Sequence, residues 1–168
     1  MEKKYRLLVD DTITVGGRTL YRIEAVRDFA NVKKGDRGGY VESEENLSHE
    51  GTCWVYDDAC VYGKAWVYDN ARVFDTARVL GNARVLGNAR VLGNARVLGN
   101  ACVLGNAWVA GNACVYGNAW VLDNACVYGN ACVLDDARVS GTARVLGNVC
   151  VLGNAKISNG IITNVVQE

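Results

Sequence analysis

Small and aliphatic residues recur along most of the chain with a period of six. From Val55 to Ile157 every sixth residue is β-branched and aliphatic, as seventeen valines followed by Ile157. Two residues before each of them lies a small residue, almost always alanine. Residues two apart in an extended strand share a face, so these two positions point inward and their neighbours point outward. The pattern predicts eighteen short strands.

Turn residues separate these strands. The unit reads A-x-V-x-G-N, and ARVLGN is repeated without change from Ala77, Ala83, Ala89 and Ala95. Glycine and asparagine tolerate positive φ, and aspartate caps turns. The inward set is too small to fill a sandwich, so successive strands wind in one direction and each coil stacks on the last, about 4.8 Å away. A fixed short period of this kind predicts a β-solenoid.

The pattern of a small residue, any residue and then valine or isoleucine resembles the hexapeptide-repeat family. That resemblance implies an all-β, left-handed parallel β-helix with three hexads per coil, and therefore six regular coils. The chain departs from many family enzymes, which carry glycine directly after the aliphatic residue, where Leu80, Tyr116 or Leu134 stands here. With its GGRTLYRI and GDRGGYVESEENLS segments, the chain resembles uncharacterised hexapeptide-repeat proteins of bacteria and their phages.

The length fits one domain, which we divide into four segments. Residues 5–15 and 18–26 read as two strands around the two-residue turn Gly16-Gly17. This hairpin is expected to cover the first coil, because a bare solenoid end exposes unpaired strand edges. Residues 161–166 are expected to fold back as a smaller cap. The predicted segments are a hairpin cap at 1–29, an irregular first coil at 30–52, the β-helix at 53–157 and a C-terminal cap or tail at 158–168.

Composition limits the possible partners. The formal net charge is zero and the pI is about 6.6, so the sequence does not favour broad electrostatic capture of nucleic acid. No apolar run reaches membrane length, and the first residues lack the apolar stretch of a signal peptide, so we expect a cytoplasmic protein. Seven cysteines, without CxxC pairs and with one histidine, fit a reducing compartment and predict no metal site. We also expect no cofactor.

The outward positions form three vertical rows of side chains. The residue between alanine and valine is almost always Arg, Cys or Trp, and the residue after valine is mostly Leu or Tyr. An exterior with so many apolar side chains predicts a surface that binds a second copy of the chain or another partner. The alternative is that these side chains stack along each row and shield one another.

The least charged row is the second, toward the C-terminal end. It carries no ionised side chain on its last strand positions, so burying it leaves no charge unpaired. We therefore predict a homo-oligomer, and the family resemblance favours a trimer over a dimer. The predicted interface consists of Cys114, Tyr116, Cys132, Leu134, Cys150 and Leu152.

Arginines surround the middle coils and provide a second candidate site. They predict an anion or nucleotide site, with tryptophan and tyrosine nearby to stack on a base. The alternative is that arginine alternates with leucine only for solubility. The candidate ligand-binding residues are Arg72, Arg78, Arg84, Arg90, Arg96, Trp108 and Trp120.

His49 is the only histidine in the chain. Hexapeptide acyltransferases, which this chain resembles in fold, typically use a histidine as general base, so His49 is the catalytic candidate under that reading. The alternative is a loop or capping residue, and the uninterrupted hexads lack loops that would form an acyl-donor pocket. The aspartate pairs 57–58 and 135–136 are interpreted as turn residues, and Cys53 as buried and inert.

These observations favour a non-enzymatic, rigid β-helical scaffold or binding module that self-associates through an apolar outer face. Two other functions stay open. One is acyl transfer with His49 as base, and the other is binding of a small anion or nucleotide by exterior arginine and aromatic side chains.

Overall fold

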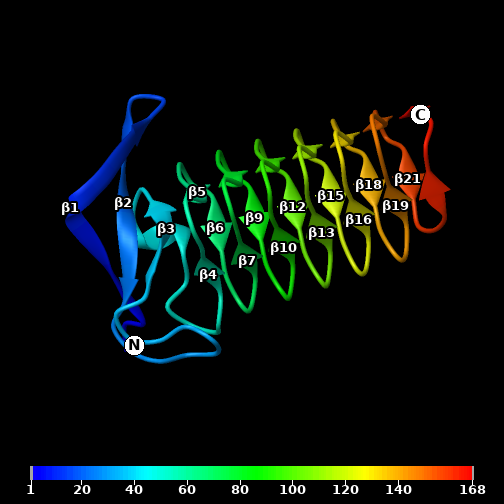
Figure 1. Cartoon of the computed structure of the whole chain (residues 1–168). Helices are drawn as coiled ribbons and strands as arrows, with labels where there is room; N and C mark the ends of the chain where they lie inside the picture. The colour runs from blue at the N-terminus through cyan, green and yellow to red at the C-terminus, as the bar shows by residue number, and fades with distance from the viewer. Residues whose placement is uncertain (1, 168) are drawn as a thin grey trace.

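The computed structural model describes residues 2–167 and forms one elongated β-solenoid with a hairpin across its N-terminal end (Figure 1). The two termini lie at opposite ends of the solenoid (Figure 1). The coils are built from eighteen short strands: β4 (Trp54–Val55), β5 (Cys60–Val61), β6 (Trp66–Val67), β7 (Arg72–Val73), β8 (Arg78–Val79), β9 (Arg84–Val85), β10 (Arg90–Val91), β11 (Arg96–Val97), β12 (Cys102–Val103), β13 (Trp108–Val109), β14 (Cys114–Val115), β15 (Trp120–Val121), β16 (Cys126–Val127), β17 (Cys132–Val133), β18 (Arg138–Val139), β19 (Arg144–Val145), β20 (Cys150–Leu152) and β21 (Lys156–Ile157).

These strands stack into three parallel sheets, one for each side of the coil. From β7 to β20 each strand pairs with the third strand before it and the third after it, so Arg90 lies between Arg72 and Trp108. A register of eighteen residues confirms three hexads per coil. We name the sheets by size: the 10-stranded sheet runs β1-β2-β3-β5-β8-β11-β14-β17-β20-β23, the 7-stranded sheet β22-β19-β16-β13-β10-β7-β4, and the 6-stranded sheet β21-β18-β15-β12-β9-β6.

A thin apolar core runs along the axis. The seventeen repeat valines are fully buried and Ile157 is 8% exposed, while the alanines two residues earlier are also buried and complete one continuous cluster. The predicted inward positions are therefore confirmed. Because each rung contributes only two small side chains from each sheet, the core stays narrow and every coil contacts mainly its neighbours.

The N-terminal hairpin extends the 10-stranded sheet beyond the first coil. Strands β1 (Tyr5–Val15) and β2 (Arg18–Ala25) pair antiparallel, with a register shift between Leu8 and Thr12. Strand β2 then pairs antiparallel with β3 (Arg37–Val41), and β3 pairs in parallel with β5. The hairpin thus covers the strand edge that the first coil would otherwise expose, as predicted.

The irregular first coil follows the same inward pattern with longer connections. Val32, Val41 and Leu47 are all buried. The single turn η1 (Glu44–Asn46) ends with the buried Asn46, whose Oδ1 accepts the backbone N–H groups of residues 42 and 43. Its Nδ2 donates to the carbonyls of residues 63 and 65, so this amide replaces missing strand pairing. Across residues 2–167 no helix is long and apolar enough to cross a bilayer.

The C-terminal segment differs from our expectation of a cap that folds back. Strand β22 (Ile161–Ile162) pairs in parallel with β19, and β23 (Val166–Gln167) pairs in parallel with β20. Both strands continue the winding direction of the coils. The hexad spacing is lost here, since Ile162 pairs with Val145 and Val166 with Val151, 17 and 15 residues earlier, yet parallel stacking on the previous coil still satisfies the backbone groups of that coil.

Several outward positions are buried, which the repeat alone did not predict, and Trp54 and Cys60 are the least exposed of them. Trp54 is 1% exposed and packs edge-on against Phe29 and Tyr5, at ring-centroid distances of 5.3 and 6.1 Å. Cys60 is 5% exposed beneath the hairpin. Both residues belong to the first regular coil, where the N-terminal segments cover the outer surface.

Candidate functional site

The part of the hairpin near its turn also covers outward side chains on the first rungs of the 10-stranded sheet. Its buried Leu20 joins Tyr40, Cys60 and Tyr62 in a second hydrophobic cluster, separate from the axial core. Three partly buried side chains complete this cluster: Ile13, Val15 and Leu80. The first rungs of the sheet are therefore apolar on the outside and are covered by the chain itself.

The same face is uncovered further along. Beyond Arg78 and Arg96 lie the six predicted interface residues, which we call the apolar strip. Tyr116 is 49% exposed and the other five are partly exposed. The three cysteines of the strip are direct register neighbours on β14, β17 and β20. The structure thus brings together all six residues of the strip: Cys114, Tyr116, Cys132, Leu134, Cys150 and Leu152.

Burial disfavours the ionised form of two thiols in this strip, Cys132 and Cys114. Burial, together with the neighbouring Cys150 and Cys114, raises the pKa of the Cys132 thiol to about 11. Burial also raises the pKa of Cys114, although the nearby Arg96 opposes the shift. A protonated thiol behaves as a small apolar group, so these two positions add apolar surface to the strip.

The candidate ligand-binding residues do not form one site. Arg72, Arg90 and Trp108 lie on the 7-stranded sheet, whereas Arg84 and Trp120 lie on the 6-stranded sheet. The remaining pair, Arg78 and Arg96, occupies the 10-stranded sheet. The sequence showed a band of arginines, but the three-sided winding separates them over three faces. A small ligand can contact only one of these groups.

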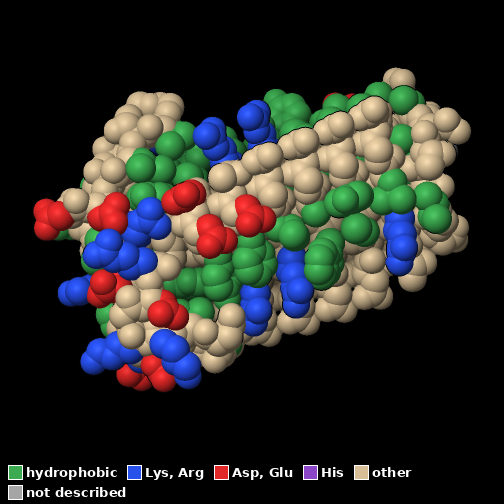
Figure 2. Space-filling model, viewed as in Figure 1, with side chains coloured by type: hydrophobic (Ala, Val, Ile, Leu, Met, Phe, Trp, Pro, Cys, Tyr) green, Lys and Arg blue, Asp and Glu red, His purple; other side chains and the backbone are tan. Residues whose placement is uncertain are grey.

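The solenoid arginines lack acidic partners. Within residues 2–167, none of the arginines from Arg72 to Arg144 forms an ion pair, and the ion pairs that occur gather at the hairpin end. Figure 2 shows the acidic side chains concentrated there. Instead, two guanidinium groups lie over tryptophan rings, Arg90 4.9 Å from the centroid of Trp108 and Arg138 5.5 Å from that of Trp120.

Aspartates of the coils serve the turns. Asp57 has a φ of 54°, and its carboxylate accepts the backbone N–H of Asp75 on the next coil at 3.2 Å. Asp135 has a φ of 60° and accepts the N–H of Gly153 in the same way at 3.1 Å. The same arrangement recurs at three more turns, in Asp69, Asp75 and Asp123.

The second members of the two aspartate pairs have other partners. Asp58 forms an ion pair with Arg22 of the hairpin at 3.3 Å, and Asp136 accepts the side-chain amide of Asn118 at 2.9 Å. These contacts hold the turns and the cap in place. They give both pairs a structural role.

His49 lies beneath the start of the hairpin. Its ring stacks on Tyr5 with centroids 4.2 Å apart, and its side chain is 11% exposed. Nδ1 accepts the backbone N–H of Lys4 at 3.3 Å, which in the neutral ring leaves the proton on Nε2, 3.3 Å from the Glu44 carboxylate. Both ring nitrogens are thus engaged in contacts that join the hairpin to the first coil.

A buried lysine was missed by sequence reasoning. The Lys4 side chain is fully buried, and its Nζ donates to the carbonyls of Cys53 at 2.8 Å and of Glu50 at 3.2 Å. The same atom lies 3.1 Å from the Cys53 sulfur. Burial lowers the pKa of Lys4 and raises that of Cys53. No sequence signal marks Lys4, because only the tertiary fold closes the first coil over it.

Comparison with known proteins gives one partial similarity. No protein-family profile matches the chain. A stretch of 42 residues, 25% of this chain, is 40% identical to the uncharacterized acetyltransferase YdcK of Escherichia coli (strain K12). The matched stretch spans only 13% of the length of that protein. Together with the coil geometry, this similarity fits a hexapeptide-repeat β-helix family.

Proposed function

We propose that the protein is a rigid β-helical scaffold that self-associates through the apolar strip of the 10-stranded sheet. The observation that carries this proposal is that the outer face of one sheet is apolar on both sides of the two rungs that hold Arg78 and Arg96. The chain covers the first rungs of that face with Leu20 of its own hairpin, and the later rungs have the same apolar composition without a cover.

A second copy of the chain is the occupant that fits the strip best. The strip carries no ionised side chain, so two strips can lose water without leaving a charge unpaired. The corresponding rungs of the other two sheets carry Arg144 and Arg138, both exposed, and would bring like charges together in a symmetric contact. We expect a trimer rather than a dimer, following the family resemblance.

Substitution of Leu134 by glutamate tests the proposal. Leu134→Glu places a carboxylate at the centre of the contact and should convert the oligomer to smaller species. Leu122→Glu and Leu146→Glu are matched controls, because both leucines hold the same position of the repeat on the other two sheets and are similarly half-buried. The measurement is light scattering coupled to size-exclusion chromatography at tens of micromolar protein.

Two results would contradict this assignment. One is a wild-type protein that is monomeric at that concentration. The other is an oligomer that survives Leu134→Glu, and its dissociation with either control substitution would assign the contact to another face.

Acyl transfer is the second candidate function, and the similarity to YdcK favours it. The base would be His49, although its ring is packed against Tyr5 and engaged at both nitrogens. If acetyl-CoA-dependent transfer is found, and if His49→Ala lowers its rate by about a hundredfold or more, the enzyme reading replaces the scaffold. A rate that His49→Ala leaves unchanged removes His49 from any such role.

We also propose that the protein works in a reducing compartment such as the cytoplasm. All seven cysteines are free thiols, and several lie on the outer surface. An oxidising compartment would expose them to disulfide formation between molecules.

A further inference from the structure

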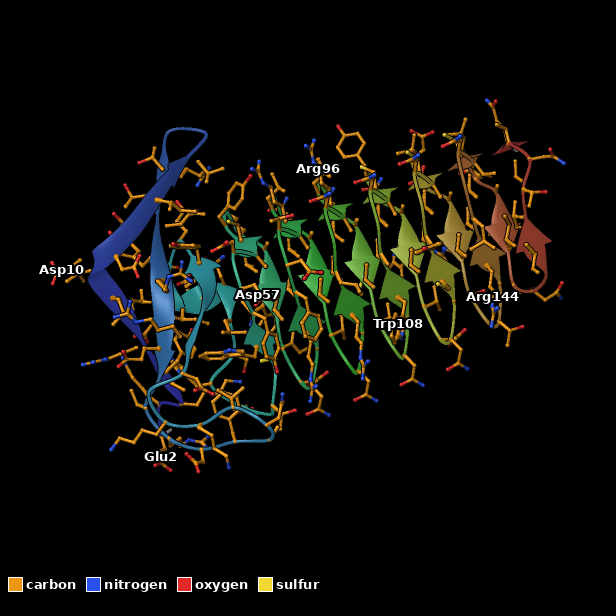
Figure 3. All side chains as sticks on the ribbon, viewed as in Figure 1. Glu2, Asp10, Asp57, Arg96, Trp108 and Arg144 are labelled. Atoms are coloured by element: carbon orange, nitrogen blue, oxygen red, sulfur yellow. The ribbon has the colours of Figure 1, made fainter. Side chains whose placement is uncertain are left out.

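We propose that a slot on the 7-stranded sheet, between Trp108 and Arg144, binds a nucleoside monophosphate. The base would lie against the indole ring, and the phosphate would pair with the guanidinium group. Figure 3 shows both labelled side chains on the same side of the solenoid, two coils apart. This face is separate from the apolar strip, so the inference does not depend on self-association.

The slot exists because a small residue separates two large ones. Cys126 is the register neighbour of Trp108 on one side and of Arg144 on the other. With a rung spacing of about 4.8 Å, the backbone positions of Trp108 and Arg144 lie roughly 10 Å apart. Between them stands only the short side chain of Cys126. A planar ring stacks about 4.5–6 Å from an indole centroid or a guanidinium group, so one ring fits between them.

The surrounding residues keep this groove open and polar at its edges. Tyr128 lines the groove and is 55% exposed, and the repeat position one coil earlier holds only Ala110 in place of the usual leucine or tyrosine. Asn106 donates to Asn124 at 3.1 Å. Within residues 2–167 that amide ladder ends at Asn124, so its own N–H groups are available to a ligand on this side.

Charge selects an anionic ligand over a neutral one. Arg144 forms no ion pair in the described part of the chain, and Arg90 adds a second positive charge on the far side of Trp108. Asp123, in the turn that precedes Cys126 in the sequence, accepts the backbone N–H of Gly141 at 3.0 Å. A phosphate is therefore recognised by a guanidinium group whose donors are not already used by a carboxylate.

The 6-stranded sheet provides an internal comparison. It carries the same three residue types in reverse order, Arg84, Cys102 and Trp120, on consecutive rungs. There the cysteine is only 9% exposed, and Arg138 stacks on the tryptophan from the next rung. The closed arrangement on this sheet shows that residue order alone does not make a slot, and it supplies matched control positions.

Isothermal titration with adenosine monophosphate tests the inference. We expect the wild-type protein to bind it with a dissociation constant below about 1 mM. Adenosine and inorganic phosphate, titrated separately, should each bind about tenfold more weakly or less, because each makes half of the contacts. Binding by the Leu134→Glu variant should equal that of the wild type, which separates this inference from the proposed self-association.

Substitutions on the two sheets then locate the site. Trp108→Leu and Arg144→Gln should each weaken binding by about tenfold or more, and Cys126→Leu should abolish it by filling the slot. Trp120→Leu and Arg138→Gln, the matched controls, should change it by less than about twofold. All variants are checked for unchanged circular dichroism. The inference is overturned if adenosine monophosphate shows no binding at about 5 mM, if phosphate alone binds equally well, or if the controls weaken binding as much as the slot variants.

Discussion

At the scale of single residues, the position within the hexad decides whether a side chain is buried in the core or exposed on the outer face. Val97 is fully buried in the axial core, whereas Arg96, its neighbour in sequence, is exposed on the outer face. The alternation of a strand places them on opposite sides of the same backbone. Adjacent residues of one repeat therefore have very different tolerance to charge.

Substituting each of these residues by aspartate should reveal the difference. Val97→Asp buries an unpaired carboxylate in a core too narrow to relax and should lower the free energy of unfolding by about 3–5 kcal/mol. Arg96→Asp should change it by less than about 0.5 kcal/mol, since a surface position has little to lose. Urea denaturation followed by circular dichroism measures both, and similar losses for the two variants would mean that the inward assignment is wrong.

At the scale of structural elements, asparagine ladders along the corners connect successive coils. Asn82 donates to Asn100 at 2.9 Å, Asn100 to Asn118 at 3.0 Å, and Asn118 to Asp136 at 2.9 Å. Each amide donates to one coil and accepts from the other, so the order of donors runs in one direction. An acceptor without N–H groups is tolerated only at the end of the ladder, where Asp136 stands.

A carboxylate one rung earlier in this ladder, at position 118, should therefore destabilise the stacked turns. Asn118→Asp removes the donor to Asp136 and sets two carboxylates side by side, at an expected cost of about 1–2 kcal/mol in the free energy of unfolding. Asp136→Asn is the control and should cost less than about 0.5 kcal/mol, because its amide oxygen still accepts from Asn118. Thermal and urea denaturation at low ionic strength measure the two changes, and equal costs would argue against a directional ladder.

At the scale of the whole molecule, the fold behaves as a stack of equivalent coils closed by a hairpin at one end. Backbone hydrogen bonds connect residues about eighteen positions apart throughout the coils, as from Arg96 to the carbonyl of Ala113 and from Leu98 to that of Val115. Stability in such a stack is a sum of contacts between neighbouring coils. Length can thus change by whole coils without altering which face a side chain occupies.

Deleting one coil should leave a folded protein with its remaining faces in order. Removal of residues 83–100, eighteen in all, keeps the hexad frame and the three-sided register. Removal of residues 84–100, seventeen in all, leaves Ala83 directly before Ala101, so the join has one residue too many and the register with the previous coil is broken there. Far-UV circular dichroism and limited proteolysis should show a native-like first variant and a disrupted second one. If both fold equally well, the stacking register does not control the fold.

The sequence by itself determined the solenoid, its period and its core. Each hexad carries its own inward pair and turn, so local pattern and global fold agree at every rung. It also predicted the hairpin, and it indicated the apolar strip because residues eighteen apart must share a face.

Only the tertiary structure decided which surfaces stay open. It buried Trp54 and Cys60 beneath the N-terminal segments, packed His49 against Tyr5 and enclosed Lys4 over Cys53. These contacts join residues from the irregular head to the first coil, where no period relates them. The repeat determines whether each side chain points inward or outward. Whether an outward side chain is covered depends on how the non-repeating segments pack, and no local sequence pattern determines that packing.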